Sequence, residues 1–113
     1  MLESVTSAAL VSALDGLSAR QRAIADNIAN VNTPGYKAKR IDFEDALRAS
    51  VARRDGHVKA TGRESLDPTR LDGNNVNLDV ETLSNIQAVL SYQFATQAVN
   101  GQFSSIRTAL RTA

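Results

Sequence analysis

Apolar residues near the N-terminus recur at alternating spacings of three and four, the step that keeps side chains on one face of a helix. The stripe consists of Leu10, Leu14, Leu17, Ile24, Ile28 and Val31. Only Gln21 interrupts it, and the alanines between its members favour helix and allow another helix to approach closely. The spacing predicts a helix over residues 2–30. Because the stripe keeps its phase across Gly16, we expect the helix to continue through this glycine.

The C-terminal part of the chain carries two such stripes on adjoining faces. The first consists of Val89, Tyr92, Thr96, Val99, Phe103, Ile106 and Leu110, and the second of Leu83, Ile86, Leu90 and Phe94. Asp79 is a suitable N-cap, and Glu81 suits the positive end of the helix dipole. The pattern predicts a helix over residues 79–112 that can contact two neighbours at once. One of them is expected to be the N-terminal helix, in an antiparallel hairpin.

The stretch between these helices, residues 32–77, holds both prolines and four of the six glycines. Within it, Asp42 is a candidate N-cap for a short helix carrying Phe43, Leu47 and Val51, and the rest indicates loop. A structureless connection longer than about 15 residues is usually functional or unfolded until bound. We therefore predict an all-α fold in which long N- and C-terminal helices form a coiled-coil-like hairpin, joined by a partly disordered middle segment that orders on assembly.

A turn motif follows the first helix, at Thr33-Pro34-Gly35-Tyr36. Pro34 disfavours helical backbone at Thr33, and Pro-Gly at the centre of four residues is typical of a type II turn, in which Gly35 has positive φ. Asn27 and Asn30 lie three residues apart just before the turn. Their amides are expected to bond the last helix carbonyls or a neighbouring subunit.

Composition and charge exclude several classes of protein. The chain has 113 residues, a formal net charge of +1, one histidine, no cysteine and five aromatic residues, which indicates one small domain with a thin core. There is no disulfide framework or thiol nucleophile, and the near-zero charge argues against a nucleic-acid binder. No apolar run approaches the roughly 18 residues needed for a membrane span. No basic residue precedes Arg20, so a cleaved signal peptide is not expected.

Three candidate sites carry little chemistry. Asp72-Gly73-Asn74 resembles the start of a calcium loop, but Val76 and Asn77 stand where the loop needs an oxygen ligand and a glycine. His57 has no partner at a catalytic spacing and is expected in an exposed loop. Lys37, Lys39 and Arg40 form the one basic cluster and are expected on a solvated face or in an inter-subunit ion pair. We expect no catalytic residue, metal, cofactor or small-molecule substrate.

The segment from Ala25 to Tyr36 resembles the N-terminal signature of the bacterial flagellar basal-body rod protein family. The resembling positions are Asn27, Ala29, Asn30, Thr33, Pro34, Gly35 and Tyr36. A second segment, Asp72 to Glu81, resembles the stretch that leads into the family's C-terminal helix. Other short rod proteins usually carry an insertion in the turn region, which is uninterrupted here, so the chain is most like the proximal-rod members.

The resemblance implies a structural subunit that polymerises through its terminal helices and transmits motor torque. It implies a division at residues 1–31, 32–77 and 78–113, and export through the flagellar type III apparatus without signal cleavage. The implied place is the rod in the cell envelope, and the implied partners are copies of the chain, other rod proteins, the basal-body base and the export apparatus.

The packing residues implied on the first helix are Leu10, Leu14, Leu17, Ile24 and Ile28. They are expected to pack against Val99, Phe103, Ile106 and Leu110, within one subunit or between subunits. Periodicity does not decide between a private core and a seam left for neighbours, and the resemblance favours the second. The alternatives are a different short rod paralogue and a self-contained helical-hairpin adaptor or export chaperone, with a small enzyme the least supported class.

Overall fold

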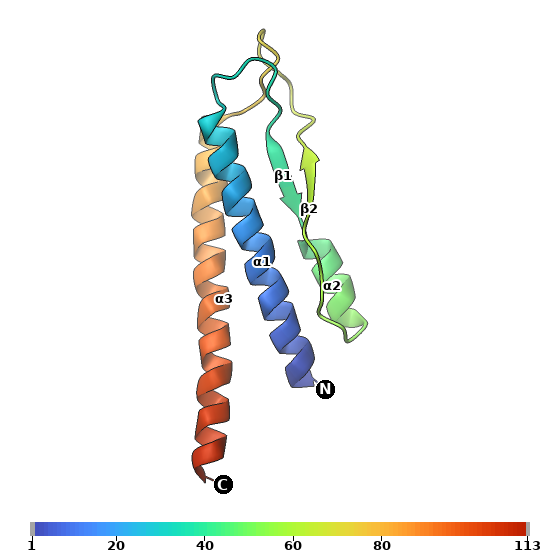
Figure 1. Cartoon of the computed structure of the whole chain (residues 1–113), viewed down its shortest axis with the longest axis vertical. Coiled ribbons are helices and arrows are strands. Elements are labelled where there is room, and N and C mark those ends of the chain that lie inside the picture. The colour runs from blue at the N-terminus through green and yellow to red at the C-terminus, as the bar shows by residue number, and fades with distance from the viewer. Residues whose placement is uncertain (1, 113) are drawn as a thin grey trace.

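The structure is a computed structural model that describes residues 2–112. It contains two long helices, a short helix and a pair of strands in an elongated molecule of 66 × 25 × 14 Å. The elements are α1 (Leu2–Ala29), β1 (Lys39–Asp42), α2 (Glu44–Ala52), β2 (Thr61–Glu64) and α3 (Leu78–Thr112). Figure 1 shows α1 between α3 on one side and the strand pair with α2 on the other.

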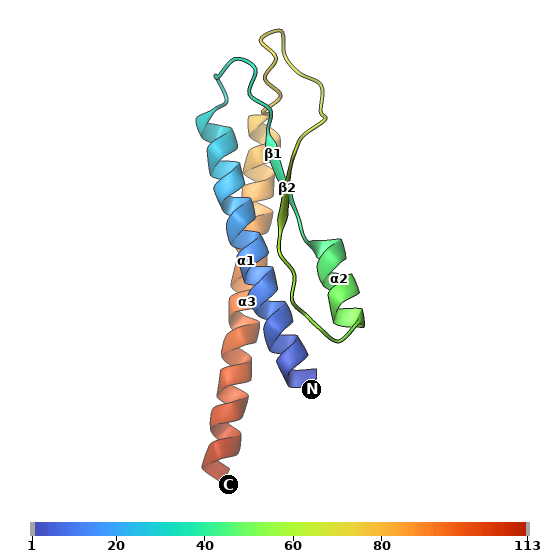
Figure 2. The same cartoon turned by 45° about the vertical axis from the view of Figure 1, so that its right-hand side comes forward.

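The helices α1 and α3 run antiparallel side by side, as both views show (Figures 1 and 2). The predicted long N- and C-terminal helices are confirmed, and α1 passes through Gly16 without a break. Near the start of α1, the Ser7 hydroxyl donates to Gln102 Oε1 at 3.0 Å. The last turns of α3 project past this end of α1 (Figure 1). We call residues 103–112, which follow Gln102 in α3, the C-terminal overhang.

The middle segment contains a sheet that the all-α prediction left out. Strands β1 and β2 pair antiparallel, from Lys39 opposite Glu64 to Asp42 opposite Thr61. Each strand has four residues, and all four positions of β2 are exposed, so no alternation of apolar and polar residues marked them in the sequence. The prediction of helix and loop alone is therefore wrong over residues 39–42 and 61–64.

Two predicted helix caps are also wrong. Helix α2 begins after Phe43, which makes no side-chain capping bond, while the predicted cap Asp42 pairs with Arg63 Nε at 2.7 Å. Helix α3 begins at Leu78, and the side-chain oxygen of Asn77 accepts bonds from the amides of Asp79 and Val80 at 3.0 and 3.3 Å. Asn77 is thus the cap, because its side chain stands where it reaches the second and third amides of the helix.

The core is built around α1. Leu17 and Ile24 of this helix are each 5% exposed, and Ser12, Gly16 and Asn27 are buried where the middle segment covers the helix. A Cβ at Gly16 would lie 2.6 Å from the ring of Phe43, so this ring rests directly on the helix backbone. The Arg20 guanidinium covers the same ring at 4.8 Å from its centroid. The missing side chain at Gly16 therefore leaves the space in which Phe43 packs, and this contact attaches the start of α2 to α1.

Candidate assembly surfaces and the polar core beneath them

The turn after α1 has the geometry of a type II turn. The Tyr36 amide donates to Thr33 O at 3.2 Å, and Gly35 has a φ of +75°. The Gly35 amide donates to Asp72 O at 2.8 Å, and a Cβ on Gly73 would lie 3.3 Å from the Gly35 Cα. The two sequence segments that carry the family resemblance therefore meet at this point, where the missing side chain of Gly73 lets the backbones approach closely.

Asparagine side chains close the C-terminal end of α1. Asn30 Nδ2 donates to Asp26 O at 2.8 Å, and Asn30 Oδ1 accepts from the Thr33 hydroxyl at 3.0 Å. Asn74 is fully buried, and its amide nitrogen donates to the carbonyls of Asn30, Val31 and Thr33 at 2.8 to 3.1 Å. A residue 44 positions away in sequence thus binds the carbonyls of the turn that follows α1.

Asn27 does not bond the last helix carbonyls but joins three elements inside the molecule. It is 0% exposed, and it bonds both backbone groups of Lys39, donating to O at 3.0 Å and accepting from N at 2.8 Å. Its Nδ2 also donates to Glu81 Oε2 at 3.1 Å, and its Oδ1 accepts from the Tyr36 hydroxyl at 3.4 Å. Asn27 therefore links α1 to β1 and to the first turn of α3.

Glu81 is a fully buried carboxylate, also 0% exposed. Besides Asn27, it meets Arg40, whose Nη1 lies 2.6 Å from Oε1. Among the described residues, every buried side-chain nitrogen and oxygen has a hydrogen-bond partner. We call Asn27, Arg40 and Glu81 the polar core. They replace large apolar side chains where α1, β1 and α3 meet.

Most of the residues that hold the middle segment in place were not predicted from the sequence. Asn75 Oδ1 accepts from the Ala38 amide at 2.7 Å, and its Nδ2 donates to the carbonyls of Ser65 and Asp67. Arg70 donates to Val76 O at 2.7 Å and to Val31 O. The run Asn74-Asn75 was visible as a motif, but nothing in a polar run distinguishes buried asparagines from those of a solvated loop.

The predicted packing residues fall into three groups. Leu17 and Ile24 are buried, Leu10, Leu14 and Val99 are half-buried, and Ile28, Phe103, Ile106 and Leu110 are exposed. Within the described chain, the least exposed positions of α3 recur along one face and are mostly small or polar. They are Glu81, Ser84, Ala88, Tyr92, Ala95, Val99 and Gln102.

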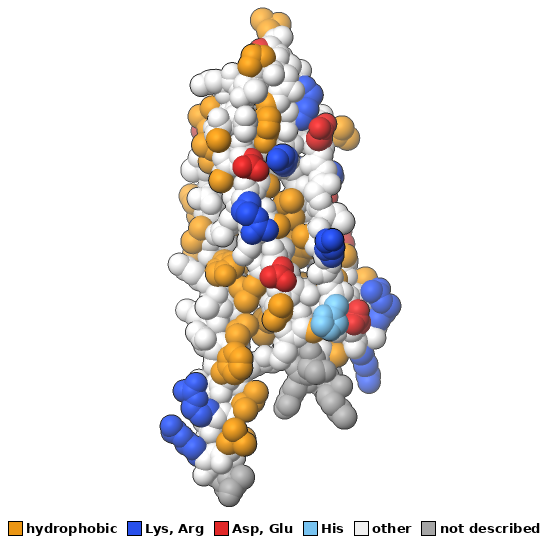
Figure 3. All heavy atoms as spheres, viewed as in Figure 1, with side chains coloured by type: hydrophobic (Ala, Val, Ile, Leu, Met, Phe, Trp, Pro, Cys, Tyr) orange, Lys and Arg blue, Asp and Glu red, His pale blue; other side chains and the backbone are white. Residues whose placement is uncertain are grey.

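Large apolar side chains of α3 remain exposed in two sets. The first is the second stripe predicted from the sequence, and it includes Phe94, which is 71% exposed. The second lies on the overhang, where Phe103 is 60% exposed and Ile106 and Leu110 are also uncovered. Figure 3 shows hydrophobic side chains gathered along the lower part of this helix. We call the first set the outer stripe and the second the overhang face.

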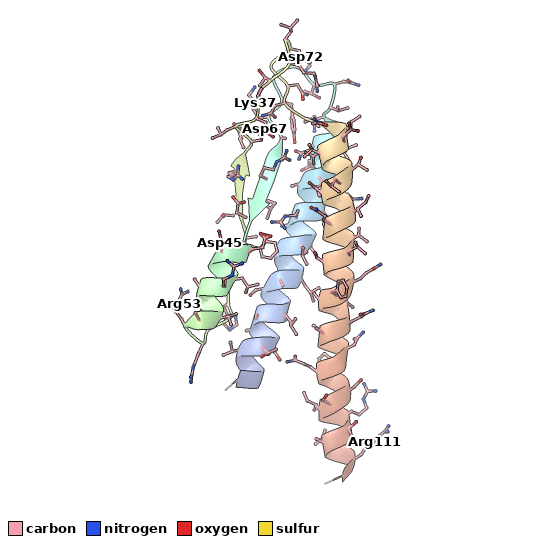
Figure 4. All side chains as sticks on the ribbon, turned by 180° about the vertical axis from the view of Figure 1, so that it is seen from behind. Lys37, Asp45, Arg53, Asp67, Asp72 and Arg111 are labelled. Atoms are coloured by element: carbon pink, nitrogen blue, oxygen red, sulfur yellow. The ribbon has the colours of Figure 1, made fainter. Side chains whose placement is uncertain are left out.

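The charged side chains are largely engaged with one another. Lys37 donates to Gly73 O, Lys39 lies 3.3 Å from Asp26, and Arg40 binds Glu81, so each member of the predicted basic cluster has a partner in the same chain. Figure 4 places Lys37, Asp67 and Asp72 at the end of the molecule where the loops meet, and Arg111 at the other end of α3.

The described residues offer little chemistry. They contain no group of three or more His, Cys, Asp or Glu side chains that could hold a metal ion. A groove of about 680 Å³ between α1 and α3 is lined by small side chains such as Ala13, Ser84 and Ala88 together with larger ones such as Leu17 and Phe43. No helix within residues 2–112 has the length and apolar character required to cross a bilayer.

Comparison with known proteins gives consistent likenesses. Residues 9–37 match the sequence profile of a family described as "Flagella basal body rod protein". The flagellar basal body rod protein FlgB of Bacillus subtilis (strain 168) is 32% identical in an alignment that covers 89% of each chain. FlgB of Borrelia hermsii is 33% identical in an alignment that covers 87% of this chain and 90% of the relative. FlgB of Escherichia coli (strain K12) is 31% identical in an alignment that covers 88% of each chain.

Proposed function

The chain belongs to the FlgB family of flagellar basal body rod proteins, and on that premise we propose that it is a structural subunit of the proximal rod. In this proposal it polymerises through its terminal helices and transmits motor torque. Its partners are copies of itself, other rod proteins, the basal-body base and the export apparatus. It acts by packing, without catalysis, a cofactor, nucleic acid or a small-molecule substrate.

The observation that carries the proposal is the large apolar surface that α3 leaves uncovered. Exposed apolar patches of this kind mark interaction sites, because burying them in a contact removes them from water. The outer stripe and the overhang face lie along one long helix, so neighbouring helices can cover both. Contacts between different surfaces of identical subunits do not have to close into a ring, and they then propagate as a helical array.

The connection between the two long helices supports a mechanical role. At one end of the molecule, Asn27, Asn74 and Glu81 tie α1, the middle segment and α3 together through buried hydrogen bonds. Fully satisfied polar networks make such a junction rigid. A rigid junction would let a subunit pass force from one helix to the other without shearing.

Export and location follow from the same proposal. We place the subunit in the rod within the cell envelope, reached through the flagellar type III apparatus without cleavage of a signal peptide. Support comes from the family, whose printed description is a basal body rod protein.

A deletion strain tests the proposal. We expect it to be non-motile and to yield basal bodies without a rod, and expression of the intact chain should restore both. Normal rods in purified basal bodies from the deletion strain would contradict the proposal. An adaptor or export chaperone would instead remain a soluble monomer or dimer at high concentration, and sedimentation of the purified chain would show no growth by mass action.

A further inference from the structure

We propose that Glu81, through Asn27 and Arg40, is a positioning residue that fixes the axial register of α3 against α1. The register is a property of the single chain. Its consequence, the choice of which apolar positions remain free for assembly, rests on the proposed function.

The alanines at the contact between α1 and α3 do not by themselves specify one register. Glu81, Ala88, Ala95 and Gln102 lie seven residues apart along α3, and Ala88 and Ala95 line the same groove as Ala13 of α1. A slip of α3 by seven residues, about 10 Å along the helix, would exchange Ala88 and Ala95 at the same part of α1. The contacts made by these alanines are therefore similar in the two arrangements and do not select between them.

The polar core removes this equivalence. In the observed register, Glu81 Oε2 accepts from Asn27 at 3.1 Å and Oε1 meets Arg40 at 2.6 Å. A shift of seven residues in one direction would place Ala88 near Asn27 and remove the carboxylate from both partners. Leaving a buried charge or amide without its partner is strongly unfavourable, and single buried polar positions are known to select register between helices.

Asn27 also positions Arg40 for its ion pair with Glu81. Its side chain bonds both the amide and the carbonyl of Lys39, so the strand residue next in sequence is held at one height along α1. Arg40 then meets Glu81 only when the first turn of α3 lies at the same height. The relative heights of α1, β1 and α3 are therefore fixed together at the polar core.

The register decides what the assembly surface contains. As observed, Ser7 lies opposite Gln102, so the overhang face begins directly after this polar contact with α1. A slip in one direction would draw Phe103 and Ile106 against the start of α1, and the opposite slip would lengthen the overhang by two turns. Neither shifted form presents the same apolar face to a neighbour.

Disulfide cross-linking of the purified chain measures the register directly, because the protein contains no cysteine of its own. The reporter of the observed register is Ser7→Cys with Gln102→Cys. The reporters of a slip pair Ser7→Cys with Ala95→Cys or with Ala109→Cys, seven residues to either side. In the parent chain we expect cross-linking in the first pair only.

The test background replaces the whole polar core by apolar side chains, Asn27→Leu with Arg40→Met and Glu81→Leu. Such replacement of a buried polar cluster is often compatible with folding. We expect helical circular dichroism to be retained, while the slipped reporters rise several-fold at the expense of the first pair. Cross-linking confined to the first pair would overturn the proposal, since the hydrogen bonds of Asn74 to the turn after α1 would then set the register without Glu81.

Two further variants separate positioning from loss of stability. Ser50 is also fully buried, but it bonds Asp55 and His57 away from α3, so Ser50→Ala should lower the melting temperature and leave the register unchanged. An equal rise of the slipped reporters in Ser50→Ala would overturn the proposal. If the triple variant does not fold, Glu81→Gln and Glu81→Met are compared: the glutamine should keep the first pair and the methionine should not, and identical cross-linking would count against Glu81. These readouts need no rod, so they are independent of the deletion experiment.

Discussion

Gly16 illustrates how a residue with no side chain positions an element far from it in sequence. The ring of Phe43 is 6% exposed and lies where a Cβ on Gly16 would stand, at 2.6 Å. Alanine is the better helix former by about 1 kcal/mol, so propensity alone predicts that Gly16→Ala stabilises α1. The clash with a buried ring opposes this gain, because overpacking costs about 1–3 kcal/mol. We expect Gly16→Ala to lower the free energy of unfolding by about 1 kcal/mol, as measured by urea denaturation.

Gly101 provides the matched control for this substitution. It lies in α3, and a Cβ there would meet nothing within 4 Å. Gly101→Ala is therefore expected to stabilise the protein by about 0.5–1 kcal/mol. Stabilisation by both alanines would show that Phe43 does not rest on Gly16.

Gly35 is constrained by its backbone and not by its neighbours. Its φ of +75° is unfavourable for a residue with a Cβ, although a Cβ there would meet nothing within 4 Å. We expect Gly35→Val to destabilise the turn by about 1–2 kcal/mol or more, because a β-branched residue is the least tolerated in this region. The strain should be less motile on soft agar, and the melting temperature of the purified protein should be lower.

Gly62 is the comparison for Gly35. It lies in β2 without positive φ, and a Cβ there would lie 3.6 Å from Ile41 Cδ1, an ordinary contact. Valine suits a strand, so Gly62→Val should leave stability and motility nearly unchanged. Equal defects in the two valine variants would refute the assignment of Gly35 to a positive-φ position in the turn.

At the scale of elements, periodicity identified the helices because each repeats its apolar step over many turns. The same reasoning failed for β1 and β2, since four residues are too few to show a period and the pairing is made by backbone groups. Cap prediction failed for a related reason. Asp79 and Asn77 are both good caps, and the choice between them depends on where the preceding loop ends and the helical backbone begins.

The candidate site was predictable only in part. The sequence located Asn27, Asn30 and the turn at Gly35, but it did not indicate that Asn27 is buried. The partners Arg40 and Glu81 come from different elements, 13 and 54 positions away in sequence. Their meeting depends on the antiparallel arrangement of α1 and α3 and on the strand pair, and a local pattern carries no information about either.

Hydrogen exchange tests how the middle segment is ordered in the free chain. We propose that order is gained in two stages. The amides of Ala38 and Lys39, bonded to buried asparagines, should be protected in the isolated protein, while the amides of the exposed residues Leu66 and Leu71 should exchange rapidly until assembly. Rapid exchange throughout residues 36–42 would mean that the whole segment orders on assembly, and protection of both parts would mean an independently folded middle.

At the scale of the whole molecule, the small number of aromatic residues and the thin core have a physical explanation. Between α1 and α3 the chain places small and polar side chains, with Ala88 and Glu81 among the most buried. The larger side chains of α3 are directed outward. The single chain therefore holds together through hydrogen bonds and close helix contact, and most of the large hydrophobic side chains of α3 remain exposed.

The overhang face gives the sharpest test of this distribution. Because Phe103 is 60% exposed, Phe103→Asp removes little from the single chain, and its melting temperature should stay within a few degrees of the parent. In an assembled contact the same carboxylate would be buried without a partner, which is costly, so rod formation should fail and the strain should be non-motile. Ser104→Asp adds the same charge to an exposed position one residue along, outside the overhang face, and should preserve motility. Motility with Phe103→Asp, confirmed by rods in purified basal bodies, would show that the overhang face is not an assembly contact. Loss of motility with both variants would attribute the defect to charge on the overhang in general.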